Sequence, residues 1–249
     1  MAVVSVNTKE VSALKIRIKF GKYGVMKFIG HLDIMRYFQK CMRRADIDIA
    51  YSEGFSPHQI MSFAAPLGVG ITSDGEYVDI EVHSTKSSKE SIDALNAVMV
   101  EGVEITSYRK LGDNDKKAMS LVAAADYELY IKDNYEVPDV DFEAALQEFF
   151  YKPSEILITK QTKKSEKVMD LKQLVYDFKI YRKEDRPVFY LKVSTGSTDN
   201  LKPELVLASF YEYLGLGFDP LSIQIHRIDV YGRIDEKLVS LGQMGEIIE

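Results

Sequence analysis

The residues that first suggest chemistry are two of the four histidines, His31 and His58. His31 falls in the expected first turn of a helix, where free backbone amides favour anions. A neutral imidazole there can act as a general base, or can bind a phosphate together with the amides. The alternative is a side chain that only packs at the start of the helix. His58 follows Pro57 on a restrained loop, and the two histidines can converge, which makes both of them candidate catalytic residues.

A row of basic residues follows His31 at helical spacing. The row consists of Arg36, Lys40, Arg43 and Arg44. Side chains three or four residues apart share one face of a helix, so these cations form a basic stripe opposite an apolar one. Nine basic residues stand against three aspartates between Val11 and Ala50, a local balance of +6 in a chain of net charge -6. The stripe suits the phosphates of a nucleic-acid backbone, and the alternative is a solvated face that serves solubility.

The segment SEGFSPH, residues 52–58, is the second part of the predicted RNA-binding surface. Gly54 permits a positive φ and Pro57 fixes its own φ, so the backbone of the loop is tightly specified. We expect RNA contacts from Ser52, Gly54, Phe55 and Ser56, with the Phe55 ring able to stack on a base. Three further candidates lie in a second basic cluster near the tip of an expected hairpin: Lys160, Lys163 and Lys164.

Other kinds of site are not indicated by the sequence. The spacings HxH, HxxxH and CxxC do not occur, so we expect no metal site. The glycine-rich nucleotide motifs and the nucleophile motif G-x-S-x-G are missing as well. The single cysteine, Cys41, excludes an internal disulfide and an iron–sulfur cluster, which needs three or four thiolates. We expect Cys41 to be a buried, inert thiol and predict no cofactor.

The periodicity of the apolar residues predicts an α+β protein made of two tandem ferredoxin-like units, residues 1–115 and 116–249. The first unit has the order β-α-β-β-α-β. Its strands are expected at 13–22, 47–51, 76–83 and 103–111, and its helices at 31–45 and 88–100. The second unit repeats this order with one additional strand. Its strands are expected at 127–131, 156–159, 174–181, 188–194 and 223–231, and its helices from 139 and 203. No element is predicted after Arg233.

The composition is that of an ordinary soluble protein, with 46% hydrophobic and 28% charged residues. No apolar run approaches the roughly 20 residues needed to span a bilayer. The N-terminal segment MAVVSVNTKE lacks the basic region followed by an apolar one that marks a leader peptide. We therefore expect a cytoplasmic protein with no membrane partner.

Several segments resemble the uncharacterised domain found in radical-SAM-linked proteins. They are GHLDIMR, RRADIDIAYSEGFSPH, SFAAPLGVGITSDGEYVDIEV, KQTKKSEKVMDLK and IHRIDVY. In that family the domain is fused behind a radical-SAM enzyme or encoded as a separate chain. The resemblance implies a radical-SAM partner and a link to translation or RNA processing. The chain is itself not a radical-SAM enzyme, because the cluster motif of those enzymes needs three closely spaced cysteines.

The expected architecture is also similar to that of the repeat-associated CRISPR RNA endonucleases. Those proteins combine tandem ferredoxin-like units with a histidine after the first strand and a glycine-containing turn. The corresponding turn in this chain is Leu214 to Phe218, and the similarity implies that His31 acts as a general acid or base.

We predict an RNA-binding accessory protein that binds tRNA or rRNA and presents it to a radical-SAM partner. The alternatives are a metal-independent ribonuclease that uses His31, and a protein–protein adaptor for a radical-SAM subunit.

Overall fold

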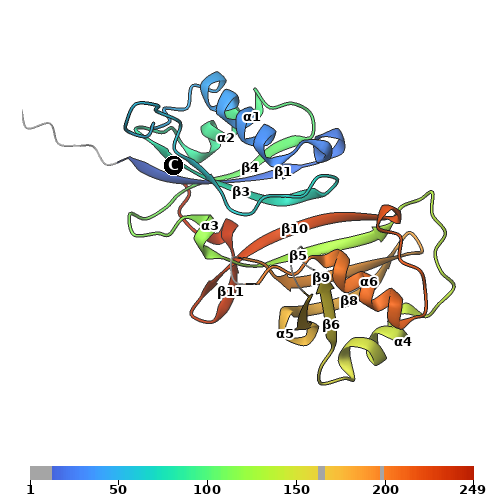
Figure 1. Cartoon of the computed structure of the whole chain (residues 1–249). Coiled ribbons are helices and arrows are strands. Elements are labelled where there is room, and N and C mark those ends of the chain that lie inside the picture. Colours follow the sequence, from blue (N-terminus) through green and yellow to red (C-terminus); the bar gives the residue numbers. More distant parts are fainter. Residues whose placement is uncertain (1–12, 162–165, 197–198) are drawn as a thin grey trace, which may run out of the picture.

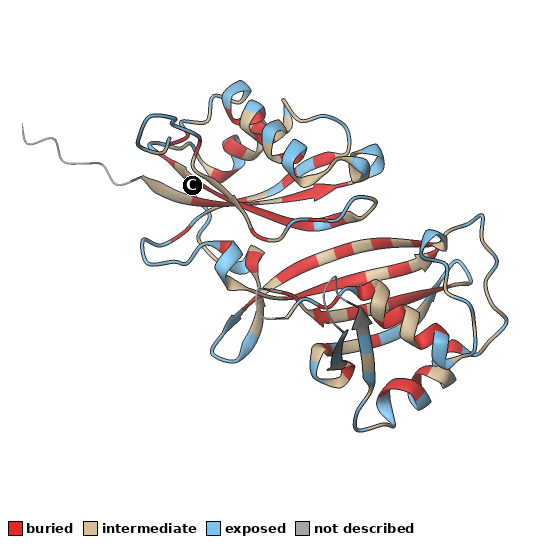
Figure 2. Ribbon diagram, in the orientation of Figure 1, coloured by how far each residue is buried: buried red, intermediate tan, exposed pale blue. Residues whose placement is uncertain are grey.

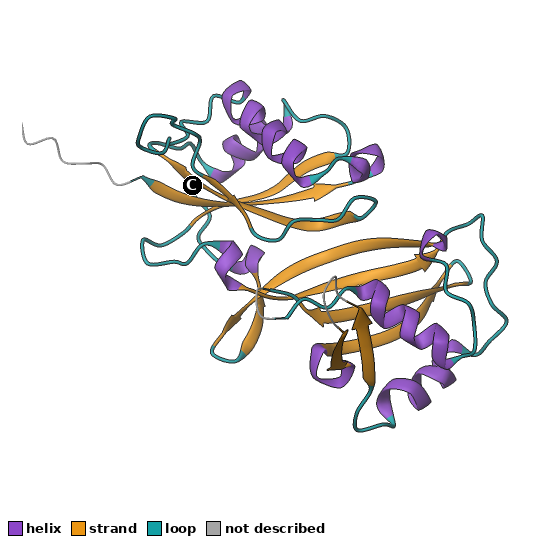
Figure 3. Cartoon of the chain, viewed as in Figure 1, coloured by secondary structure: helices purple, strands orange, loops and turns teal. Residues whose placement is uncertain are grey.

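In the part of the chain that the structure describes, the strands form one mixed, nine-stranded sheet and a separate two-stranded sheet. This computed structural model describes residues 13–161, 166–196 and 199–249. The large sheet has the strand order β4-β1-β3-β10-β5-β9-β8, with β2 paired to β3 and β11 paired to β10. Figure 1 shows helices packed over each end of this sheet, and Figure 3 shows helices and strands in separate layers. The predicted α+β class is confirmed.

The first half of the chain follows the predicted order of elements. They are β1 (Leu14–Lys22), α1 (His31–Arg44), β2 (Met61–Phe63), β3 (Thr72–Val82), α2 (Ser88–Asn96) and β4 (Val103–Lys110). The alternation in β1 buries Ile16, Ile18 and Phe20. The Phe20 ring packs against Phe38 of α1, with ring centroids 4.6 Å apart. The apolar faces of strand and helix therefore build the first core.

The strand predicted at 47–51 is wrong as a continuous strand. Only two isolated bridges form there, Ile49 with Val82 and Tyr51 with Gln59. The backbone of Asp46 has a positive φ of 52° just after α1, and the chain leaves the sheet again at the 52–58 loop. The strand that occupies the expected place beside β3 is β2, ten residues later in the chain.

The second half repeats the pairing pattern of the first. Its elements in the large sheet and over it are β5 (Val122–Ile131), α4 (Phe142–Leu146), β8 (Val175–Lys183), β9 (Arg186–Ser194), α6 (Pro203–Tyr213) and β10 (Ile223–Ile234). A π-helical turn, Gln147–Tyr151, extends α4. The strands pair antiparallel in the order β10-β5-β9-β8, as β4-β1-β3-β2 do in the first half.

Three strands, rather than the one predicted, are added in the described part of the second half. Two of them, β6 (Leu157–Gln161) and β7 (Glu166–Asp170), pair with each other away from the large sheet, and the third, β11 (Lys237–Ser240), pairs with β10. The short helix α5 (Leu171–Leu174) connects β7 to β8. The sequence placed a hairpin tip in this region but did not identify its second strand.

The two halves meet where β3 and β10 run parallel, with His226 opposite Thr72 and Arg227 opposite Ser73. The predicted boundary at 115/116 falls in the loop between β4 and the short helix α3 (Ala118–Leu121). The C-terminal segment, for which no element was predicted, forms β11 (Lys237–Ser240) and then returns to the first half, where Glu246 bridges to Lys110.

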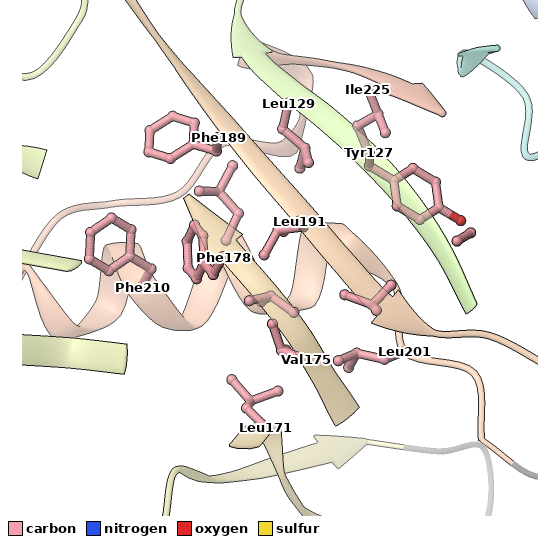
Figure 4. Packing of buried hydrophobic residues seen from close by; sticks show 14 of the residues in the cluster. Tyr127, Leu129, Leu171, Val175, Phe178, Phe189, Leu191, Leu201, Phe210 and Ile225 are labelled. Carbon is pink, nitrogen blue, oxygen red and sulfur yellow. The ribbon is translucent and has the colours of Figure 1, made fainter. Parts of the chain in front are cut away.

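Each half has its own buried core, as the red bands of Figure 2 show. In the second half Phe178, Phe189 and Phe210 pack together between the sheet and α6 (Figure 4). The predicted burial of Cys41 on α1 is confirmed. None of the helices in the described part of the chain is long and apolar enough to cross a membrane.

Candidate functional site

The basic row lies along the outer face of α1. The helix begins at His31 after the N-cap residue Gly30, and its apolar stripe is buried: Ile34, Phe38, Cys41 and Met42. Burial of this stripe fixes the rotation of the helix, so the four cations at the alternate positions point into solvent. Arg36, Lys40, Arg43 and Arg44 are all exposed. The helix therefore presents one continuous cationic surface.

Most of these cations have no carboxylate partner. Arg36 Nη1 lies 3.2 Å from Asp33 Oδ1, and both side chains are about two-thirds exposed. An exposed pair of this kind contributes little free energy and is screened by salt. Within residues 13–161, 166–196 and 199–249, Lys40, Arg43 and Arg44 form no ion pair. At least three cations of the row are thus available for an anionic partner.

The 52–58 loop is closed on itself by hydrogen bonds between its two ends. The Ser52 amide donates to the His58 carbonyl at 2.8 Å, and the His58 amide donates to Ser52 Oγ at 3.1 Å. Ser52 Oγ also lies 2.8 Å from His58 Nδ1. Gly54 has a φ of 104°, a conformation that favours glycine. These bonds hold Phe55 at the tip, where its ring is fully exposed.

The loop is attached beside α1. The Gln59 amide donates from Nε2 to the Gln39 carbonyl at 3.1 Å, so the loop lies next to the second half of the helix, near the basic row. Ser56 is exposed and Ser52 is half-buried. The predicted loop residues and the cations of α1 therefore occupy neighbouring parts of one surface.

The two histidines are not brought together. His31 lies at the start of α1, where its ring contacts Phe63 edge-on at 5.3 Å. His58 adjoins Gln59, which is bonded to the helix at Gln39, eight residues further along. With a rise of about 1.5 Å per residue, this offset is about 12 Å. His58 bonds within its loop, and His31 packs against an aromatic ring.

Of the second basic cluster, the structure describes only part. Lys160 lies on β6, opposite Lys167 on β7. Lys163 and Lys164 lie outside the described residues. The hairpin that carries this cluster belongs to the second half of the chain.

A cavity that the motifs did not indicate lies between the two halves. It has a volume of about 620 Å³. The 64–71 segment of the first half forms one wall, and the chain around Thr195 and the start of α6 forms the other. Val122 and Met119 complete the apolar lining, while Tyr127 and Arg227 contribute polar groups. Figure 4 shows Tyr127 on its strand, in the same region as Leu201.

A buried ion pair stands at the edge of this cavity. Arg227 is 3% exposed and Glu76 is 4% exposed. The guanidinium donates from Nε to Glu76 Oε1 at 2.8 Å and from Nη2 to Glu76 Oε2 at 2.5 Å. Nη2 also donates to the Ala65 carbonyl at 2.9 Å. Burial lowers the pKa of Arg227, but the Glu76 carboxylate outweighs this effect and holds the pKa above its ordinary value.

A third ionisable side chain, Lys22, belongs to the same buried group. Its ammonium donates from Nζ to the Ile29 carbonyl at 2.8 Å. Burial lowers the pKa of Lys22, and the Glu76 carboxylate opposes that shift. The group links β1, β3 and β10 beneath the 64–71 segment.

One buried polar atom at the cavity is unsatisfied. Thr195 is 7% exposed, and its hydroxyl oxygen has no hydrogen-bond partner among the described residues. A buried hydroxyl without a partner is uncommon, because it has lost its hydrogen bonds to water. Sequence reasoning did not find this residue, since an isolated threonine after a strand has no distinctive spacing.

No group of three or more potential metal ligands occurs within the described residues.

Comparisons with known proteins give one family match. The family model described as "Uncharacterized protein conserved in bacteria (DUF2344)" matches residues 15–203. No curated protein matches the chain.

Similar solved structures include "Crystal Structure of a Cbf5-Nop10-Gar1 Complex", with a TM-score of 0.44 and 12% identity. That match covers 86% of this chain, which spans about half, 48%, of the chain in the complex. A second is "Crystal Structure of an Unknown Protein from Galdieria sulphuraria", with a TM-score of 0.23 and 13% identity. It covers 87% of this chain and 96% of the other.

Proposed function

The chain belongs to the family of uncharacterized proteins conserved in bacteria (DUF2344), and we propose its function from the site itself. We propose an accessory protein that binds structured RNA through α1 and the 52–58 loop. The observation that carries this proposal is the exposed cationic row on α1, of which three members have no carboxylate partner in the described part of the chain. A row of this kind suits successive phosphates of an RNA backbone.

The loop supplies a second kind of contact. Phe55 stands fully exposed at the tip of a loop whose two ends are hydrogen-bonded together. An exposed ring on a rigid support can stack on an unpaired base at a small entropic cost. Cations on the helix and an aromatic on the loop would thus grip the backbone and an unpaired nucleotide of the same RNA, with tRNA or rRNA as the expected class.

The partner for this RNA-bound form would be a radical-SAM enzyme, as the resemblance to radical-SAM-linked proteins implies. We also propose that each half is a ferredoxin-like unit. The support is the shared antiparallel strand order, β4-β1-β3-β2 in one half and β10-β5-β9-β8 in the other. The first unit would then carry the RNA surface.

The test is RNA binding by the intact chain at several salt concentrations. The variant Arg36→Glu/Arg43→Glu/Arg44→Glu is compared with wild type, using bulk tRNA and rRNA fragments. Three phosphate contacts predict that a fourfold rise in salt weakens wild-type binding by roughly 20- to 40-fold. We expect the variant to lose most of this salt dependence and at least about tenfold in affinity at low salt.

A matched control reverses three exposed cations of the second half, Lys152, Arg233 and Lys237. It changes the net charge equally and should keep most of the affinity. A neutral variant, Arg36→Gln/Arg43→Gln/Arg44→Gln, keeps helix propensity and separates lost contacts from a weakened helix. Equal loss in the control and in the α1 variant, or no binding by wild type at low salt, would contradict the proposal.

A further inference from the structure

We propose that the cavity between the two halves is a binding site for an uncharged, nucleoside-sized heterocycle, held by the Thr195 hydroxyl and by Tyr127 between apolar walls. This site is separate from the cationic surface of α1. Three observations carry it: the size of the cavity, the balance of its charges and the unsatisfied hydroxyl.

The size suits a small molecule. The cavity holds about 620 Å³, and pockets for small ligands occupy about 300–1,000 Å³. Its apolar lining comes from both halves, with Leu67 and Ile71 on one side and Val122 and Leu201 on the other. Such walls bury the faces of a ring system. A polymer segment or a second protein would need an extended groove.

The charged side chains that line the cavity are compensated, since Arg227 is paired with Glu76, and Lys22 of the same buried group lines the neighbouring small pocket instead. This arrangement selects against an ionic ligand. The Arg227 guanidinium is shared between two oxygens of Glu76 and the Ala65 carbonyl. Its positive charge is therefore already compensated. Lys202 and Glu204, which also line the cavity, carry one charge of each sign. A free anion such as inorganic phosphate would have to compete with Glu76 for Arg227, whereas a neutral molecule has no such competitor.

The unsatisfied hydroxyl supplies specificity. Thr195 lines the cavity and is 93% buried. Its hydroxyl oxygen has no partner among the described residues and is itself closed to water, so a rotation of the side chain must accompany its bond to a ligand. A hydroxyl can donate and accept, so it pairs with the amide-like edge of a heterocycle. Tyr127, which is 6% exposed, adds a phenol at the same cavity. Apolar faces, a hydrogen-bonding edge and no charge are the properties of a nucleobase.

This ligand can come from two sources. One is a free nucleoside. The other is a base extruded from an RNA bound on α1, and only this second source rests on the proposed function. The segment Ala65, Pro66 and Leu67 lines both the cavity and the small pocket that contains His31. One thin wall therefore separates the start of α1 from the cavity.

The experiment for the first source is equilibrium dialysis of the intact chain with adenosine, guanosine, cytidine and uridine, each tested alone, with ribose as the control for the sugar. Thr195→Val keeps the shape of the side chain and removes its hydroxyl. Val69→Trp/Met119→Trp fills the mouth of the cavity at two exposed positions. We expect at least one nucleoside to bind and ribose not to bind. We expect Thr195→Val to weaken binding by about fivefold, and the filled variant to abolish it.

The experiment for the second source uses tRNA in which 2-aminopurine replaces single unpaired bases. Fluorescence of this base rises when it leaves the stack. A rise on binding wild type that is absent with the filled variant supports an extruded base. The α1 charge-reversal variant should retain free-nucleoside binding, because it leaves the cavity intact.

The outcomes separate the two proposals. If RNA binding fails but a nucleoside binds and the filled variant loses it, the cavity site stands and the proposed function falls. If RNA binds through α1 while no nucleoside binds and no base is extruded, the cavity proposal is overturned alone. Nucleoside binding that persists in the filled variant also overturns it. Retained circular dichroism and retained RNA affinity of the filled variant show that it is folded.

Discussion

The row of cations on α1 and the Glu76–Arg227 pair use the same side-chain chemistry in opposite surroundings. On α1 the charges are exposed, and the one ion pair there, Arg36 with Asp33, is two-thirds exposed on both sides. At the cavity both charges are almost wholly buried and share several short hydrogen bonds. Exposed charges remain available to a partner and contribute little to stability. The buried pair is committed to the fold and is not available to a charged partner.

The sharpest way to test this difference is to remove one member of the buried pair. Arg227→Met leaves the Glu76 carboxylate without its partner, and we expect the free energy of unfolding to fall by about 3–5 kcal/mol. Urea denaturation followed by circular dichroism measures it. The exposed counterpart, Arg36→Met, should change stability by less than about 0.5 kcal/mol. A similar loss in both variants would contradict the distinction.

Removing both charges refines this test. Glu76→Leu/Arg227→Met eliminates the unpaired carboxylate but also removes the anion that acts on the buried Lys22, so its stability should recover only part of the loss seen in Arg227→Met. If the double variant is as unstable as the single one, packing of the two side chains rather than their charge determines the cost.

The next largest effect concerns binding alone. Phe55→Ala removes the exposed ring of the 52–58 loop, and loss of one stacked base costs about 1–3 kcal/mol of binding free energy. Stability should stay within about 0.5 kcal/mol, because the ring touches little of the protein. Filter binding with tRNA measures the affinity. The control Tyr213→Ala removes an exposed ring from α6 and should leave the affinity unchanged; equal losses would rule out a specific role for Phe55.

The third effect is a pH dependence from Lys22. Burial lowers its pKa in the folded protein below the usual 10.5. Between these two pKa values the unfolded chain binds more protons than the folded one, so the Lys22 contribution to stability rises with pH. At pH values below both pKa values the two states are protonated alike and the contribution is flat.

Comparison with Lys22→Met isolates this contribution. Stability of both proteins is measured by urea denaturation at pH values from 7 to 10.5, and the difference between the two curves should move in favour of wild type as the pH rises. A constant difference across this range would mean that Lys22 has the same pKa in both states.

The smallest expected effect is at the exposed pair. Asp33→Asn frees Arg36 and removes a negative charge from the cationic surface, so RNA affinity at low salt should rise about two- to threefold. The free energy of unfolding should fall by no more than about 0.5 kcal/mol. Titrations at 50 and 200 mM salt measure the effect, which must shrink at the higher concentration. A loss of affinity would show that Asp33 itself contacts the RNA.

The difference between the two regions also explains what the sequence could predict. The α1 row depends on spacing within one helix, so the periodicity of residues 31–44 was sufficient to place its four cations on one face. The same reasoning found most elements of both halves. It placed a strand at 47–51 because polar and apolar residues alternate there, but alternation alone does not show whether a neighbouring strand is available to pair with.

The cavity was beyond this reasoning because its parts are distant in the sequence. Glu76 and Arg227 are 151 residues apart, and Thr195 belongs to neither segment. Each residue is unremarkable in its local pattern, and only the parallel contact of β3 with β10 brings the walls together. The expected convergence of His31 with His58 failed for a related reason. Closeness along the chain does not determine which turn of a helix a loop will meet.

The same contact between β3 and β10 has a consequence for folding during synthesis of the chain. The residues it joins, such as Thr72 and His226, are 154 positions apart. On the ribosome, β1 to β4 can assemble once about half of the chain has emerged, well before β10 exists. Until then the start of β3 has an open edge, which can pair with another nascent chain. The protein therefore depends on late synthesis of its last long strand to close this edge, and truncation before residue 226 would leave the edge open.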